Sequence, residues 1–155
     1  MKKIIFLFAI TMMSLVACQK SEENIAAKNM TEALGRLSAV KIWKVDKITR
    51  DGVLKYENGT YFDDTFDGVA ETLAFNTASK TITVTYPDGE VSIFEYEINN
   101  DTQTFTVKDE DDTEVMTIKS GSVFSDKFEL ESTYGVTNNG VETMVTDVIT
   151  LVPKD

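Results

Sequence analysis

Residues 81–98 read TITVTYPDGEVSIFEYEI. Before Pro87-Asp88-Gly89, threonine alternates with an apolar residue at every second position, and after it glutamate alternates in the same way. This period of two is typical of strands with one buried and one solvated face, and Pro-Asp-Gly is turn chemistry that joins them into a hairpin. The apolar positions are Ile82, Val84, Tyr86, Phe94, Tyr96 and Ile98.

The same alternation continues over most of the chain after residue 38, with turn residues such as Asn58-Gly59 between the segments. We therefore expect an all-β domain over residues 38–155, built as an up-and-down antiparallel meander of eight or nine strands. Such a meander either closes into a barrel or splits into a sandwich. We expect the barrel, because tight hairpins join consecutive strands and no long crossover is needed. The predicted strands are 40–49, 53–57, 69–76, 80–86, 90–98, 103–108, 113–119, 123–134 and 141–152.

A short helix is predicted ahead of the strands, over residues 25–37. Apolar side chains lie there on one stripe of a 3.6-residue period. Gly35 lies inside this segment and costs roughly 1 kcal/mol relative to alanine, so the helix is expected to depend on docking against the domain. The stripe consists of Ala26, Met30, Ala33, Leu34 and Leu37.

The N-terminal segment has the pattern of a lipoprotein signal peptide. Lys2 and Lys3 precede an apolar run over residues 4–16, which is shorter than the roughly 20 residues needed to span a bilayer. Leu15-Val16-Ala17-Cys18 resembles a lipobox, which implies cleavage after residue 17, a diacylglycerol on the Cys18 sulfur and an acyl chain such as palmitate on its amino group. The alternative is an ordinary signal peptide followed by an unpaired cysteine. Because Cys18 is the only cysteine, an intramolecular disulfide is excluded.

Residues 18–24 are expected to form a lipidated tether. Gln19-Lys20-Ser21-Glu22-Glu23 resembles the lipoprotein export signal of Bacteroidota, a short patch of lysine or serine with acids after the lipidated cysteine. The resemblance implies an outer-membrane lipoprotein exposed on the cell surface. The alternative is an ordinary solvated tether that carries no export signal.

Charge and composition exclude several classes of function. None of the 26 acidic side chains lies in residues 1–17, whereas two of the 15 basic ones do, so the mature chain has 26 acids against 13 bases, a net charge of −13. Such a charge repels nucleic acid, so no nucleic-acid partner is expected. Histidine is absent, which removes histidine triads and HExxH zinc sites. We expect no enzyme, no catalytic residue and no cofactor.

The first predicted strand carries a tryptophan in Ile42-Trp43-Lys44-Val45, after the helical lead-in and before the meander. Together these features resemble the lipocalin-like (calycin-type) lipoproteins of Bacteroidota over roughly residues 38–153, although the glycine expected two positions before the tryptophan is missing. The resemblance implies that Trp43 packs across one end of a barrel and that a small hydrophobic or amphipathic molecule binds inside. The alternative is a structural or protein-interaction lipoprotein whose aromatic residues fill a solid core. The candidate ligand-lining residues are Phe75, Tyr86, Phe94, Tyr96, Phe105 and Phe128.

A weak candidate metal site lies at Asp63, Thr65 and Asp67. With Gly68, these residues match positions 1, 3, 5 and 6 of a calcium-binding loop. The pattern then fails, because Ala74 stands at position 12, where a bidentate glutamate belongs.

Overall fold

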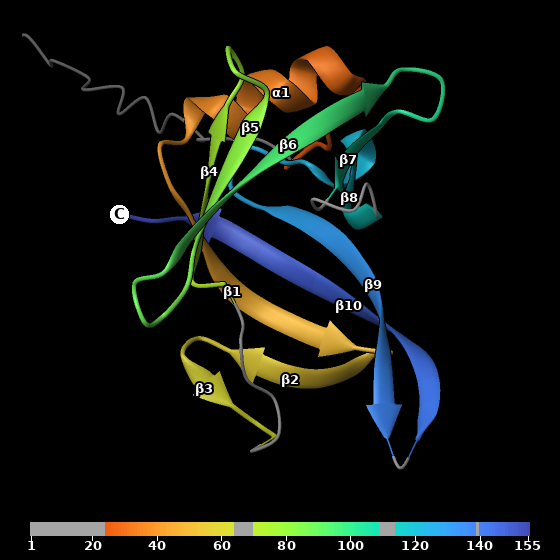
Figure 1. Ribbon diagram of the computed structural model, residues 1–155. Helices are drawn as coiled ribbons and strands as arrows, with labels where there is room; N and C mark the ends of the chain where they lie inside the picture. The colour runs from red at the N-terminus through yellow and green to blue at the C-terminus, as the bar shows by residue number, and fades with distance from the viewer. Residues whose placement is uncertain (1–23, 64–69, 109–113, 139) are drawn as a thin grey trace, which may run out of the picture.

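The computed structural model describes residues 24–63, 70–108, 114–138 and 140–155 (Figure 1). One helix, α1 (Met30–Ala39), precedes the strands, and a 3-10 turn, η1 (Ser120–Ser122), follows the eighth of them. The prediction of an all-β fold with one short helix is confirmed. The strands of the described residues are β1 (Trp43–Arg50), β2 (Val53–Glu57), β3 (Thr60–Tyr61), β4 (Thr72–Asn76), β5 (Thr81–Thr85), β6 (Val91–Asn99), β7 (Thr104–Lys108), β8 (Glu114–Lys119), β9 (Phe128–Asn138) and β10 (Val141–Pro153).

Eight of these strands close into an antiparallel barrel, as predicted. The order is β1-β4-β5-β6-β7-β8-β9-β10, and β10 pairs back with β1 from Trp43↔Pro153 to Arg50↔Asp147. The other edge of β1 is shared, because its start pairs with β4 and its end with β2. The β2–β3 hairpin therefore lies outside the ring of eight strands. The two-residue strand β3 was not predicted.

The helix begins at Met30, so the predicted start at residue 25 was wrong. Asn29 caps the helix, since its side-chain oxygen accepts the Glu32 backbone N–H at 3.0 Å. Before the cap the chain is not helical, and the Ala27 N–H donates to the Val123 carbonyl at 2.7 Å. No helix among the residues described is long and apolar enough to cross a membrane.

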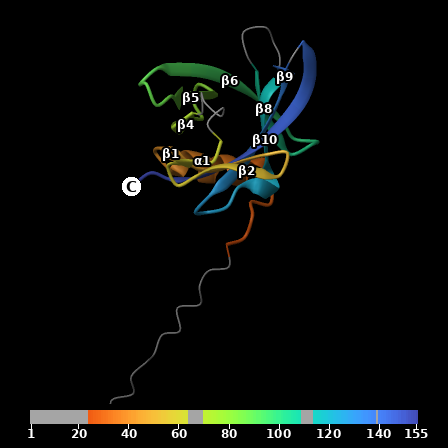
Figure 2. The ribbon, with the colours of Figure 1, turned by 90° about the horizontal axis from the view of Figure 1, so that it is seen from below.

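α1 covers one end of the barrel, which we call the helix end (Figure 1). Met30, Ala33 and Leu37 are buried on the face that meets the strands. The Gln103 side chain accepts the Met30 backbone N–H at 3.0 Å, so the β6–β7 turn holds the first turn of the helix. The opposite end, which we call the distal end, carries the β1–β2 and β5–β6 turns. Figure 2 shows the barrel from that side.

Trp43 lies between the barrel and the helix. It is fully buried, and its Nε1 donates to the Leu37 carbonyl at 2.9 Å. Its ring meets Phe128 edge to face, with centroids 4.9 Å apart. The helix end is therefore closed by one packed unit of helix, tryptophan and strand. Other large side chains that are fully buried in the core include Ile48, Ile82, Phe105, Ile118, Leu130 and Leu151.

Candidate functional site

The six candidate lining residues all lie in or against the core, but they divide into two groups. Tyr96, Phe105 and Phe128 are buried, and the rings of Tyr96 and Phe105 pack edge to face 5.5 Å apart. These three give a ligand almost no free surface. The other three, Phe75, Tyr86 and Phe94, are half-buried and pack against the core cluster. Phe75 contacts Phe128 at 5.6 Å, which leaves Tyr86 and Phe94 as the aromatic candidates without a ring partner among the described residues.

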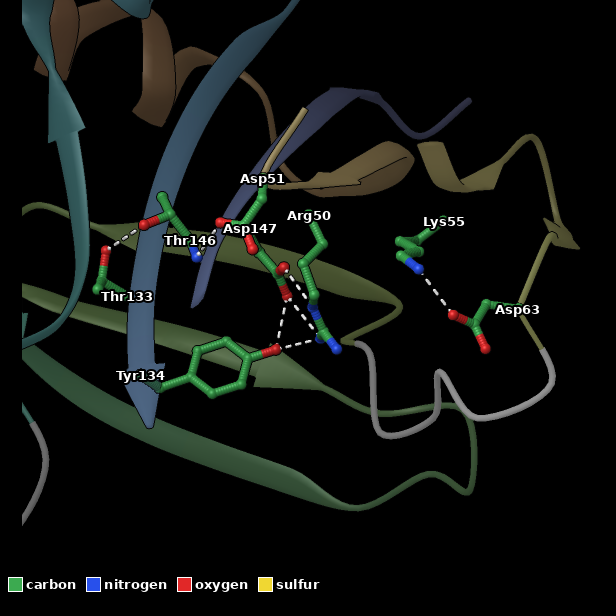
Figure 3. Close-up of polar contacts among 8 residues, drawn as sticks. All are labelled: Arg50, Asp51, Lys55, Asp63, Thr133, Tyr134, Thr146 and Asp147. Atoms are coloured by element: carbon green, nitrogen blue, oxygen red, sulfur yellow. Dashed lines mark hydrogen bonds and ion pairs between the residues drawn. The ribbon is translucent and has the colours of Figure 1, made fainter. Parts of the chain in front are cut away.

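A polar cluster of Arg50, Tyr134 and Asp147 lies on the inner face of the barrel near the distal end. The three side chains come from the adjacent strands β1, β9 and β10 and point toward one another (Figure 3). Asp147 shares the inward face of β10 with Ile149 and Leu151. We call these three residues the polar cluster.

A β-bulge in β1 turns Arg50 inward. The pairing of β1 with β10 shifts register between Val45 and Lys47. Trp43 and Val45 are buried before the shift, and Ile48 is buried after it. The extra residue moves the inward face from odd to even positions, so Arg50 follows Ile48 into the interior.

The contacts within the polar cluster are short and multiple. Arg50 Nε donates to Asp147 Oδ1 at 2.9 Å and Nη2 donates to Oδ2 at 3.1 Å, a bidentate ion pair. The Tyr134 hydroxyl donates to Asp147 Oδ2 at 2.7 Å and accepts from Arg50 Nη2. The Arg50 guanidinium also lies 5.5 Å from the centroid of the Tyr134 ring. Asp147 is only 5% exposed, so its charge depends on these two partners.

The β1–β2 turn fixes the end of β1 beside the cluster. Asp51 and Gly52 both have positive φ, 48° and 80°, which a two-residue type I′ hairpin turn requires. The Asp51 N–H donates to the Thr146 carbonyl at 2.9 Å, and its side chain accepts the Thr146 N–H at 3.1 Å (Figure 3). These two hydrogen bonds to β10 hold Arg50 directly opposite Asp147.

Arg50 keeps its charge and Tyr134 keeps its proton at neutral pH. The hydrogen bond to Asp147 raises the pKa of Arg50 further above its usual range. Burial, and next the hydrogen bond to Asp147, raises the pKa of Tyr134 to about 12. The tyrosine therefore keeps its proton, and the cluster is a charge-balanced, hydrogen-bonding surface without a nucleophile.

Alkaline pH is expected to weaken the fold through Tyr134. Its folded pKa of about 12 lies above the value of about 10 for an unfolded tyrosine, so its stabilising contribution is complete below pH 10 and is lost as the pH rises toward 12. Tyr134 is 36% exposed, so solvent screening reduces its contribution to the free energy of unfolding. Urea unfolding between pH 8 and 11.5 should show a smaller loss of stability for Tyr134→Phe than for the wild type. Burial also raises the pKa of Tyr96, so some loss should remain; equal slopes for both proteins would contradict the assignment.

Only part of the candidate metal site can be placed. Thr65 and Asp67 lie outside the described residues, as does Cys18, and the Asp63 carboxylate accepts from Lys55 Nζ at 2.7 Å (Figure 3). No group of three or more histidine, cysteine, aspartate or glutamate side chains within the described ranges could hold a metal ion.

The polar cluster was not predicted from the sequence. One signal was present, since Asp147 interrupts an otherwise apolar set of alternate positions that includes Val145 and Ile149. A carboxylate on an inward face needs a cationic or donor partner, so this position could have been singled out. Arg50 had no comparable signal, because its inward direction depends on the bulge.

Comparisons with protein-family models, with curated protein sequences and with solved structures find no match to this chain.

Proposed function

We propose that this protein is a lipid-anchored outer-membrane lipoprotein whose lipocalin-like barrel binds a small amphipathic molecule in its distal half. The observation that supports this is a difference between the two halves of the inner face. At the helix end, Trp43 and Phe128 are fully buried beneath α1. Toward the distal end, Tyr86 and Phe94 keep part of their surface exposed, in the half of the barrel that also holds the partly exposed Tyr134.

The chemistry of the distal half suits a ligand with an apolar body and a neutral polar head. Tyr86 and Phe94 offer ring surface to the apolar part. The Arg50 side chain is 26% exposed and Tyr134 is 36% exposed, so both can offer hydrogen-bonding groups to the polar head of the ligand. Because Asp147 already neutralises Arg50 and the chain is strongly acidic, an anionic head is disfavoured. The binding needs no covalent chemistry.

Titration with the neutral amphipathic dye N-phenyl-1-naphthylamine tests this proposal. We expect saturable binding with one dye per chain and a rise in dye fluorescence. Ser92 lies on the inward face of β6, opposite the buried Val84, whereas its neighbour Ile93 is 67% exposed on the outer face. Ser92→Phe should fill the distal interior and weaken binding at least tenfold, while Ile93→Phe should bind as the wild type does. Equal affinities for the two variants, or no saturable binding by the wild type, would overturn the proposal.

A second candidate is a structural or protein-interaction lipoprotein with a solid barrel. The complete burial of Phe105 and Phe128 and the edge-to-face contacts that they make favour it. This candidate predicts that the wild type binds no apolar dye and that Ser92→Phe lowers the melting temperature through overpacking alone.

Lipid anchoring rests on Cys18 and is tested separately. Several acyl chains on one residue exceed what stable membrane anchoring requires, because each buried CH₂ contributes roughly 0.8 kcal/mol. In a bacterium that processes lipoproteins, we expect the wild-type chain to fractionate with membranes and enter the detergent phase of Triton X-114. Cys18→Ser should move to the aqueous phase or stay as an uncleaved precursor. A Cys18→Ser protein that is cleaved normally and still partitions into detergent would contradict lipidation at this residue.

A further inference from the structure

Strands β9 and β10 continue past the barrel as a two-stranded ribbon. β10 pairs with β9 from Val141↔Asn138 to Leu151↔Phe128, but its pairing with β1 begins only at Asp147. Among the described residues, β9 pairs with β8 at Glu131. We call residues 133–146 the ribbon; it extends beyond the other strands at the distal side (Figure 1).

The outer edge of β10 in the ribbon presents backbone groups without a strand partner. Thr146 turns both its N–H and its carbonyl away from β9, since both bond to Asp51. In an antiparallel ladder this direction recurs at every second residue, so Met144 and Glu142 also turn their backbone groups to this edge. No strand among the described residues pairs with them there. Such an edge is a template for another strand.

The edge lacks the features that usually protect a free strand. Its register with β9 is continuous, without a bulge, and the ribbon contains neither proline nor lysine. Its only charged residue is Glu142. Val141 and Met144 are 63% and 61% exposed, so the ribbon presents apolar side chains to a partner.

We propose that the outer edge of β10 pairs with the same edge of a second copy of this chain, which makes a two-fold symmetric dimer. A partner must approach a molecule whose chain after residue 17 has a net charge of −13, and a second copy carries the same charge. The ribbon is where this repulsion is weakest, because it holds one of the 26 acids. An edge with alternating donors and acceptors is also complementary to itself, as a two-fold interface requires.

The register of this pairing follows from the direction of the backbone groups. Placing the two-fold axis at Thr143 sets Glu142 of each copy opposite Met144 of the other, so outward-turned groups meet in hydrogen-bonded pairs. The two Glu142 side chains then do not face each other. Val141 of each copy lies across from Val145 of the other on one face, which covers the exposed Val141 with apolar surface. The pairing of two copies through the ribbon does not depend on ligand binding inside the barrel.

Sedimentation of the chain from residue 19 onward tests the dimer, because that chain retains every described residue and therefore the whole barrel with its core. Between 5 and 500 µM we expect a reversible monomer–dimer equilibrium. Met144→Glu should raise the dissociation constant at least tenfold, because it sets a second carboxylate directly opposite Glu142 of the other copy, whereas Met144→Leu should change it less than threefold. Ile93→Glu is the matched control, because Ile93 is similarly exposed on the outer face of β6, and it should change the dissociation constant less than threefold. A chain that is monomeric up to 500 µM, or a dimer that Met144→Glu does not weaken, would overturn the proposal.

A single cysteine tests the register. The chain from residue 19 contains no cysteine, so Thr143→Cys introduces only one, and the two-fold axis places it opposite its copy. Facing residues of a pair without mutual hydrogen bonds have the closest side chains in an antiparallel ladder, within reach of a disulfide. Under mild oxidation Cys at 143 should cross-link at least tenfold faster than Thr77→Cys, a control in the exposed β4–β5 turn. Equal rates would overturn this register.

Discussion

Replacing Trp43 with alanine is expected to lower the free energy of unfolding by about 3–5 kcal/mol, the range for truncating a large buried aromatic side chain. Trp43 is fully buried, its ring meets Phe128 at 4.9 Å, and its Nε1 donates to the Leu37 carbonyl at 2.9 Å. The alanine variant therefore leaves a cavity and also removes the donor that ties the last turn of α1 to the barrel. Urea unfolding followed by far-ultraviolet circular dichroism measures the loss.

Trp43→Phe separates the packing from the hydrogen bond. Phenylalanine keeps much of the ring contact with Phe128 but cannot donate to Leu37, so it should cost about 1–3 kcal/mol, from a smaller cavity and one buried acceptor without its donor. Tryptophan fluorescence cannot follow either variant, because Trp43 is the only tryptophan. A loss below about 1 kcal/mol for Trp43→Ala would contradict the packed helix end, as would equal losses for both variants.

The strands could be predicted because their alternation is local. In residues 81–98, every predicted apolar position from Ile82 to Ile98 is buried or half-buried, and the glutamates between them are exposed. The start of α1 could not be placed by periodicity alone, because Ala26 fits the helical stripe but lies before the Asn29 cap. β3 has two residues and no period to detect.

Closure of the barrel depends on contacts between residues far apart in the chain. The pairing of Trp43 with Pro153 joins the two ends of the β domain, and no local pattern specifies it. The preference for a barrel rested on the hairpin connections, and it was right. The hairpin connections could not predict that one edge of β1 pairs partly with β4 and partly with β2.

The candidate site shows the same division between local and non-local information. Alternation predicted that Tyr86 and Phe94 face inward, and they pack against the core. Alternation could not distinguish these two residues from Phe105 and Phe128, because the exposed fraction of each ring depends on which elements pack against it in three dimensions. The polar cluster needs both the β1 bulge and the β1–β10 pairing, so Arg50 and Asp147 could only be joined in three dimensions.

Breaking the ion pair of the polar cluster from one side is expected to cost more than removing it altogether. Asp147 is 5% exposed, so Arg50→Met leaves a carboxylate in the barrel interior that has lost its cation and keeps the hydrogen bond from Tyr134. The loss of a partner from a buried pair costs about 3–5 kcal/mol, and the 26% exposure of the Arg50 side chain reduces the expected value to about 2–4 kcal/mol. Asp147→Leu leaves the more exposed cation and should cost about 1–3 kcal/mol. Urea unfolding at pH 7 measures both.

The double variant Arg50→Met/Asp147→Leu should recover to within about 1 kcal/mol of the wild type, because apolar side chains of similar volume remove the desolvation cost of both charges. The resulting coupling energy between the two positions should then be at least about 2 kcal/mol. Additive losses would mean that the pair behaves as an exposed surface ion pair. If the double variant is stable but binds N-phenyl-1-naphthylamine less selectively against an anionic analogue, the barrel retains its buried charges for recognition and not for stability.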